Sequence, residues 1–178
     1  MIGLDNHEEF HTMSAGQDLF RQVMRRWASA VTIVTTQVGD QARGLTVSGF
    51  AGISLEPPLV MISVGHNQNS HAWISDGGCF VVNFLRADQR ELSDRFAGRT
   101  AGVADRFVGV AHRSQVSGAP VLEECLAWFD CRVAAAHVVG DHTIFIGEVL
   151  AGAVVSDADP LVYYDGAYRR LGDVKRDA

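Results

Sequence analysis

The sequence contains no apolar run that approaches the ~20 residues a helix needs to cross a membrane. Its first residues are polar and acidic, whereas a secretory signal peptide begins with basic residues followed by an apolar stretch. We therefore expect a cytoplasmic protein that makes no contact with a membrane. The net charge of −6 argues against a nucleic-acid-binding protein, because neutralising phosphates requires a basic stripe.

Several signatures of catalysis and metal binding are also missing. No GxGxxG, GxxxxGK[ST], HExxH or GxSxG pattern occurs, so Rossmann, P-loop, zinc-protease and α/β-hydrolase chemistry lack their usual motifs. The histidines after the N-terminal tail have no HxH or HxxxH spacing, and the cysteines have no CxxC spacing. We therefore predict no metal site, and we interpret three cysteines as small buried hydrophobic residues: Cys79, Cys125 and Cys131.

What the sequence does contain is typical of one globular domain. Its 178 residues can bury a core, and 47% hydrophobic with 20% charged residues is an ordinary composition. Residues 1–13 lack periodicity and are predicted to be a flexible tail, so the single domain spans 14–178. Ser14 and Gln17 have capping-box spacing at the start of an amphipathic helix, whose apolar stripe must pack on something. The stripe consists of Leu19, Phe20, Val23, Met24 and Trp27.

Strand patterns dominate the rest of the chain. The dipeptides Gly39-Asp40 and Gly140-Asp141 indicate hairpins. Short helices are predicted at 69–75 and 87–98, and a loop at 99–120. At least six mostly antiparallel strands predict a mainly β fold, a small closed or split barrel, because closure removes exposed sheet edges. The predicted strands are 31–38, 44–50, 59–64, 79–85, 126–139, 142–155 and 161–164.

Charged and aromatic residues within these strands are interpreted as structural. Asp130, Arg132 and Glu148 are predicted to pair with one another on the solvated face of the long hairpin. The C-terminal tyrosines receive no specific role, because aromatic residues in strands usually belong to the core. They are Tyr163, Tyr164 and Tyr168.

Four segments, in this order along the chain, strongly resemble the short-chain flavin reductases: 44–64, 80–98, 140–149 and 160–171. The resemblance runs from about residue 18 to residue 171. It implies a flavin-binding split β-barrel, antiparallel with a few short flanking helices, that forms a homodimer. It also implies FAD or FMN as the flavin, NADH or NADPH as the hydride donor with NADH favoured, and a separate flavin-dependent monooxygenase as partner.

The segment 44–50 is predicted to bind the flavin ring, which the family places along this strand. Small and β-branched residues leave room for an aromatic plane, and hydroxyl groups add hydrogen-bonding partners. The alternation of polar residues in this segment equally fits a strand with one solvated face, so both interpretations stay open. The residues assigned to cofactor binding here and on the following segment are Thr46, Val47, Ser48, Ser54 and Ser63.

Asn69 and Ser70 are predicted to bind the phosphate or ribityl end of the flavin. Turn residues at a helix N-terminus offer unpaired N–H groups to an anion, although an ordinary helix cap is the alternative. Many relatives carry Thr-Ser where this chain has Ala51-Gly52, and Arg or Lys where it has His66. These differences leave the choice between FMN and FAD open.

His142 is the predicted catalytic-site residue, with the role of positioning the nicotinamide. It follows a hairpin turn at the head of a strand, and relatives use the matching histidine around the nicotinamide. Its imidazole can hydrogen-bond the carboxamide or the phosphates of the donor. A solvated histidine without a role is the alternative.

The predicted function is hydride transfer from NADH to FAD or FMN, followed by release of the reduced flavin to the separate monooxygenase. The transfer requires no acid or base side chain, so the protein acts by positioning and by stabilising charge on the flavin. Two alternatives remain. One is a flavin- or haem-binding protein without turnover, and the other is an oxidoreductase that retains its flavin and reduces another acceptor.

Overall fold

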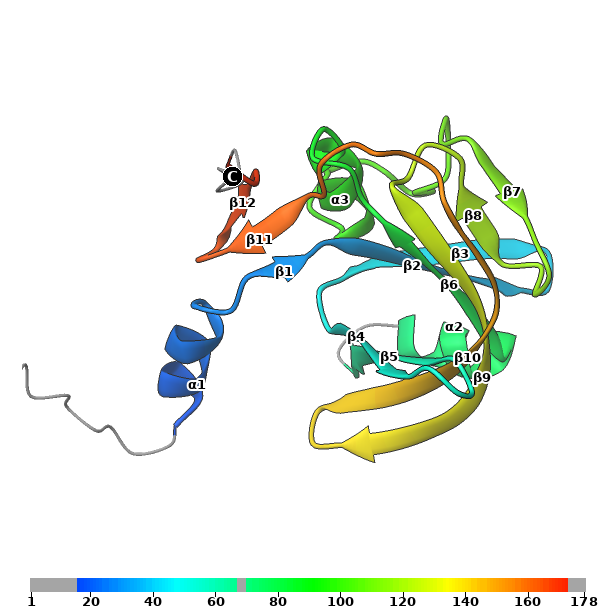
Figure 1. Ribbon diagram of the computed structural model, residues 1–178, viewed down its shortest axis with the longest axis horizontal. Helices are drawn as coiled ribbons and strands as arrows, with labels where there is room; N and C mark the ends of the chain where they lie inside the picture. Colours follow the sequence, from blue (N-terminus) through cyan, green and yellow to red (C-terminus); the bar gives the residue numbers. More distant parts are fainter. Residues whose placement is uncertain (1–15, 67–69, 173–178) are drawn as a thin grey trace, which may run out of the picture.

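The computed structural model describes residues 16–66 and 70–172, which form a mainly β fold with three short helices (Figure 1). Seven antiparallel strands build one curved sheet, as the sequence predicts. In spatial order these strands are β3 (Gln41–Val47), β2 (Thr32–Val38), β6 (Cys79–Phe84), β9 (Ala127–Val139), β10 (His142–Val154), β5 (Leu59–Gly65) and β4 (Phe50–Ser54).

The connection between β3 and β4 curls this sheet into a split barrel. The two strands form opposite edges of the sheet, yet only Ser48 and Gly49 separate them in the chain. The edges must therefore approach each other, and the Ser63 N–H donates to the Gly49 carbonyl across the split at 2.8 Å. The single strand predicted at 44–50 is wrong in this respect, because the chain turns at Ser48-Gly49 and Phe50 begins a new strand.

The long hairpin of β9 and β10 contributes two inner strands of the curved sheet, and its turn end lies at the bottom of the view in Figure 1. Gly140 in its turn has a φ of 60°, a left-handed conformation that favours glycine, which explains why Gly140-Asp141 predicts this turn correctly. The register shifts twice along the hairpin, and such bulges increase the local twist that closure requires.

Strand β6 is buried on both faces, which accounts for its almost entirely apolar sequence. Its one polar residue, Asn83, is also buried, and its side-chain amide donates to the Ile33 carbonyl at 3.0 Å. Phe80 and Val82 point into the barrel interior, where they meet Ile62 of β5 and Phe145 of β10. Val81 belongs to a second cluster outside the barrel wall. This second cluster is covered by α3 (Arg90–Phe96) and by the small sheet of β7 (His112–Ser114) and β8 (Pro120–Leu122).

Helix α2 (Ser70–Gly77) inserts the fully buried Ile74 into the interior cluster. Its existence confirms the predicted helix at 69–75, although Asn69 lies outside the described residues. The third sheet is formed by β1 (Ser29–Ala30), β11 (Val162–Tyr164) and β12 (Ala167–Arg169).

Helix α1 (Gln17–Met24) projects away from the barrel, in contrast to the other two helices (Figure 1). None of its residues is buried in this chain: 67% of Phe20 is exposed, as is 69% of Trp27, which follows the end of the helix. The apolar stripe predicted here therefore exists but does not pack on its own barrel. Ser14 and the predicted tail at 1–13 lie outside the described residues.

Two further expectations need correction. The predicted loop at 99–120 contains β7, whose partner strand β8 begins at Pro120. Arg132 and Glu148 do form an ion pair of 2.6 Å across the hairpin, but Asp130 is wholly buried and accepts the Ser117 N–H at 2.9 Å. Asp130 is thus sequestered under the 115–119 segment instead of joining the solvated pair.

The three cysteines are buried and unpaired, as predicted. Burial raises the pKa of Cys125 to about 11 and that of Cys131 to about 12, so both thiols stay protonated and unreactive at neutral pH. None of the helices in the described part of the chain is long and apolar enough to cross a membrane.

Candidate active site

A groove of about 520 Å³ lies at the split in the barrel, where β3 and β5 end beside the β9–β10 turn. We call it the strand-end groove. Five residues predicted from the sequence line it: Thr46, Val47, Ser48, Ser63 and His142. The remaining lining residues are Leu45, Gly49, Val64, Gly65, His66 and Asp141.

The turn at Ser48-Gly49 shapes the floor of this groove. A Cβ atom at Gly49 would lie 3.1 Å from the Cβ atom of Ser63, so glycine permits the close approach of the two edge strands. Ser48 is exposed and Ser63 is half-buried, which leaves both hydroxyl groups beside the groove. They can therefore hydrogen-bond a ligand there.

The side chains of Thr46 and Val47 are less available to a ligand than their prediction as cofactor-binding residues implies. The Thr46 hydroxyl donates to the Ser93 carbonyl of α3 at 2.6 Å, so it is already committed to holding that helix. The side chain of Val47 packs in the barrel interior with Leu45 and Val60. Val47 can therefore meet a ligand in the groove mainly through its backbone.

A smaller hollow of about 240 Å³ adjoins the groove, and we call it the central slot. Thr46 and Ser48 line both spaces, so the groove and the slot are contiguous along the end of β3. The other lining residues of the slot are Val31, Ser93, Phe96, Ala97, Arg99, Tyr163 and Tyr168.

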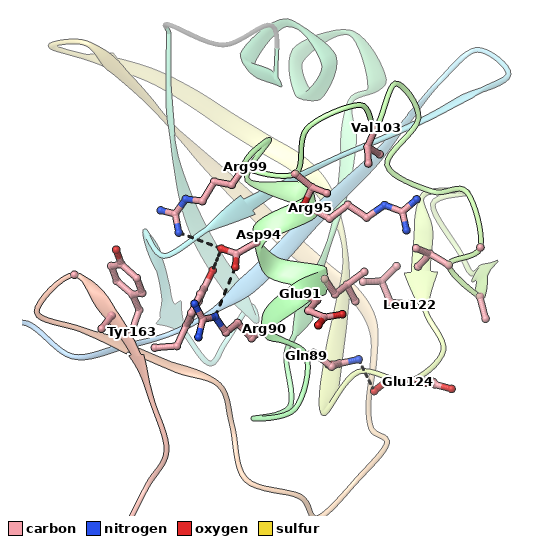
Figure 2. A pocket seen from close by; sticks show the side chains of 18 residues that line it. Gln89, Arg90, Glu91, Asp94, Arg95, Arg99, Val103, Leu122, Glu124 and Tyr163 are labelled. Carbon is pink, nitrogen blue, oxygen red and sulfur yellow. Dashed lines mark hydrogen bonds and ion pairs between the residues drawn. The ribbon is translucent and has the colours of Figure 1, made fainter.

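A third and larger hollow, about 1070 Å³, lies on the other side of the slot beside α3 (Figure 2). We call it the α3 hollow, and it shares Arg99, Tyr163 and Tyr168 with the slot. The three spaces thus follow one another from His142 at one end to Arg95 and Glu124 at the other. The volumes of the strand-end groove and the α3 hollow are within or near the range of small-molecule binding sites.

Asp94 organises the charges between the slot and the α3 hollow, as Figure 2 shows. Its carboxylate lies 3.2 Å from Nη1 of Arg99 and 3.7 Å from Nε of Arg90. The Tyr168 hydroxyl lies 2.8 Å from the same carboxylate, and burial raises the pKa of that tyrosine. Ser93, Asp94 and Arg99 were not predicted as site residues. The contacts of Ser93 and Asp94 with Tyr168 of β12 bridge 75 and 74 positions of sequence, and no local pattern reveals contacts of that range.

His142 stands at the opposite end of this series of spaces. Its Nδ1 lies 2.7 Å from Oδ1 of Asp141, and 47% of its side chain is exposed. The His142 imidazole, through this hydrogen bond and its charge, holds the pKa of the Asp141 carboxyl below its ordinary value. Strand pairing places His142 opposite Gly65, so the next residue, His66, stands beside the same turn.

Two of the predicted cofactor-binding residues do not reach these spaces. Ser54 ends β4 beside Leu59, and Ser70 is 1% exposed at the start of α2. Neither lines the groove, the slot or the α3 hollow, and Asn69 lies outside the described residues. The structure therefore brings five of the eight predicted site residues together.

The family of the chain follows from comparison with known proteins. Residues 24–172 match the family described as flavin reductase like domain. This chain belongs to the flavin reductase family. The groove of this flavin reductase family member lies at the split in the barrel, where Ser48-Gly49 joins the two edge strands.

Named relatives agree with that assignment. The chain is 37% identical over 172 residues to "FMN reductase (NADH) SmoA" of Agrobacterium fabrum, covering 96% of this chain and 95% of that protein. It is 35% identical to the reductase component of 4-hydroxyphenylacetate 3-monooxygenase of Thermus thermophilus, covering 87% of this chain and 97% of that protein. The solved flavin reductase PheA2 is 34% identical, with a TM-score of 0.82 over 89% of this chain and 100% of that chain. The resemblance and the barrel fold predicted from the sequence are confirmed.

Proposed function

We propose that this protein oxidises NADH and reduces FAD or FMN, and that it releases the reduced flavin to a separate monooxygenase. The observation that carries the proposal is the contiguity of the strand-end groove and the central slot at Thr46 and Ser48. Contiguous spaces on one strand end allow two ring systems to be held next to each other, which is the requirement for direct hydride transfer. NADH is favoured over NADPH because the relative from Agrobacterium fabrum is named for NADH.

The residues around the groove fit a flavin bound along the end of β3. When bound, the flavin supplies the hydride acceptor and NADH supplies the donor, so the chain need not provide redox chemistry. We assign to the Ser48 and Ser63 hydroxyls the task of hydrogen-bonding the flavin ring. Thr46 acts as a positioning residue, since its hydroxyl fixes α3 against β3.

His142 in this proposal positions the nicotinamide. Its side chain is half exposed at the mouth of the groove, and Asp141 fixes the ring through Nδ1. The other ring nitrogen is then available to the carboxamide of the nicotinamide. The chain thus contributes orientation and charge stabilisation, and no side chain has to transfer a proton in the hydride step.

We further propose a diffusible flavin and a cytosolic homodimer. The relative from Thermus thermophilus is a reductase component that works with a monooxygenase, which supports transfer of reduced flavin between two proteins. The exposed apolar residues of α1, such as Phe20, together with Trp27 just after the helix, support an interface with a second copy of the chain. Three buried unpaired cysteines suit a reducing compartment.

The test is to mix purified protein with NADH and either FMN or FAD and to follow absorbance at 340 nm. Loss of absorbance that depends on flavin supports the proposal, whereas no loss with either flavin contradicts it. Gel filtration of the flavin-loaded protein then distinguishes the two catalytic alternatives. Loss of flavin on the column supports a diffusible substrate, and stoichiometric retention supports an oxidoreductase that keeps its flavin.

A further inference from the structure

Arg99 is the only arginine or lysine among the described residues that line the strand-end groove and the central slot. It follows the end of α3, where its backbone N–H donates to the Asp94 carbonyl at 2.9 Å, and 56% of its side chain is exposed. The guanidinium group of arginine is charged at every pH at which proteins are folded. A permanent positive charge therefore borders the slot at this position.

The neighbours of Arg99 balance its charge only in part. The Asp94 carboxylate lies 3.2 Å from Nη1 of Arg99 but also 3.7 Å from Nε of Arg90, so two guanidinium groups share one carboxylate (Figure 2). The Tyr168 hydroxyl lies 2.8 Å from the same carboxylate, and burial raises the pKa of this tyrosine, so it is neutral at neutral pH. One positive charge is thus left over in this cluster beside the slot.

The carboxylates of the surrounding spaces do not neutralise this charge. No carboxylate lines the slot within the described part of the chain. The carboxylate of the groove, Asp141, lies 2.7 Å from His142 at the far end of the series of spaces. Glu91 and Glu124 line the α3 hollow but not the slot. An anion in the slot would therefore meet Arg99 without a competing carboxylate in the same space.

Hydride transfer creates such an anion on the flavin ring. The C4–H bond of NADH breaks, an N5–H bond forms on the flavin, and the electron pair enters the ring, so the products are NAD⁺ and a reduced flavin with one negative charge. This charge is shared by N1 and the oxygen on C2, at one edge of the ring. A fixed cation beside that edge stabilises the reduced ring, whereas the oxidised ring is neutral and gains much less.

We infer that Arg99 is the cation that stabilises the negative charge of the reduced flavin, with the N1–C2 edge of the ring in the central slot. The inference rests on the proposed function, because it assumes that a flavin binds along the end of β3. The groove and the slot are contiguous at Thr46 and Ser48, so one ring can extend from the groove into the slot. The protein therefore binds the reduced ring more tightly than the oxidised ring.

The first experiment compares the Kd of oxidised and reduced FMN, measured by equilibrium dialysis at pH 8 in the absence of oxygen. Arg99→Gln weakens the binding of reduced FMN by about tenfold, a modest value for a charged hydrogen bond because Arg99 is half exposed. The Kd of oxidised FMN changes by less than about twofold. Arg99→Lys keeps the charge and retains most of the preference for reduced FMN.

The midpoint potential of the bound flavin gives the same comparison independently of turnover. The ratio of the two dissociation constants sets this potential. For a two-electron couple, a tenfold loss of affinity for the reduced form lowers the potential by about 30 mV. Arg99→Gln should show this shift, and Arg99→Lys should show a smaller one.

The matched control is Arg90→Gln. Arg90 shares the Asp94 carboxylate with Arg99 and lies over the ring of Tyr168, 5.4 Å from its centroid, but it does not line the slot. Its loss therefore disturbs the same cluster without removing a charge from the slot. Arg90→Gln should retain the preference for reduced FMN that the unaltered protein shows.

Riboflavin separates the charge of the ring from that of the phosphate. Reduced riboflavin carries the same negative ring charge as reduced FMN but has no phosphate. A tenfold loss of affinity for reduced riboflavin in Arg99→Gln supports the inference. A loss for both forms of FMN and for neither form of riboflavin would show that Arg99 binds the phosphate, and it would contradict the inference.

Two further results would overturn it. One is an equal change, or no change, in the affinities for oxidised and reduced FMN in Arg99→Gln, and the other is an equal effect of Arg90→Gln. If the unaltered protein bound neither form of FMN, the inference would fail together with the flavin site of the proposed function. Binding of FMN without any NADH oxidation would contradict the proposed function alone, so the two failures are distinguishable.

Discussion

The strand-end groove and the α3 hollow differ in how they hold positive charge, although they flank the same slot. The α3 hollow contains Arg90, Arg95 and Arg99, yet Asp94 binds two of them and backbone carbonyls hold the third. The groove contains no arginine, and its His66 has a buried hydroxyl as partner instead of a carboxylate. The number of arginines in a cavity therefore does not show where an anion binds, because the charge that matters is the one left unbalanced.

The junction between the two spaces gives the strongest test of this comparison. Ser48→Trp places a large ring where the groove and the slot meet. This ring should prevent the flavin from binding there and from being aligned with NADH. We expect kcat/KM to fall by on the order of 100-fold, as for other misplaced reactants. Steady-state kinetics with NADH and FMN provide the measurement.

Ser75→Trp is the matched control for that substitution. Ser75 is an exposed serine of α2 that lines none of the three spaces, so the same new ring should leave activity within about twofold. Equal losses in both variants would mean that a surface tryptophan harms the protein in general, and the assignment of Ser48 would fail.

How much of this site the sequence predicts depends on the range of the contacts involved. Gly140-Asp141 predicts the turn that carries His142, because a hairpin turn is a local property. The slot wall could not be predicted, since Tyr168 reaches Ser93 across 75 positions in the chain. Likewise β7 is missed because all three of its residues are exposed, and only its pairing with β8 makes it a strand.

Burial of charge was the other property that local patterns did not reveal. Arg132 and Glu148 were predicted to pair, and the register places them directly opposite each other. Asp130 was predicted to join them but is buried, because the Ser117 N–H, 13 positions earlier in the chain, binds its carboxylate. Side-chain alternation gives the face of a strand, whereas the segment that covers that face is set by the tertiary fold. The ligand-binding roles of the groove residues remain predictions.

The substitution His142→Ala tests the proposed role of the strand-end groove in binding the nicotinamide. Removing the imidazole should raise KM for NADH by roughly threefold to tenfold, the effect of one lost hydrogen bond, and leave KM for FMN unchanged. His137→Ala serves as the control, since His137 is an exposed residue of the same hairpin outside the groove. Unaltered NADH kinetics in His142→Ala would remove the residue from the nicotinamide site.

The α3 hollow is tested by Asp94→Asn, which removes the carboxylate shared by Arg90 and Arg99. Because Asp94 is about one-quarter exposed, solvent screens these pairs, and we expect a loss of only about 1 kcal/mol of stability. A Tm lower by roughly 2–4 °C in a thermal melt corresponds to that value. KM for NADH should change by less than about twofold, because Asp94 does not line the strand-end groove that contains His142. A large fall in KM would show that the arginines freed by the substitution bind an anionic group of the substrate from the α3 hollow.

The smallest effect is expected from Tyr168→Phe, at the border between the slot and the α3 hollow. Burial raises the pKa of Tyr168, so the fold favours the protonated hydroxyl. The stabilisation from this group is therefore complete below the ordinary tyrosine pKa near 10 and is lost as the pH rises through the higher pKa of the folded protein. Urea unfolding at pH 8 and above pH 10 should show a steeper alkaline loss of stability in the unaltered protein than in Tyr168→Phe. The difference should stay below about 1 kcal/mol, because the side chain is partly solvated. Parallel pH dependence in the two proteins would mean that the Tyr168 hydroxyl is solvated in solution, and the contacts that join β12 to α3 would then have to come from its ring alone.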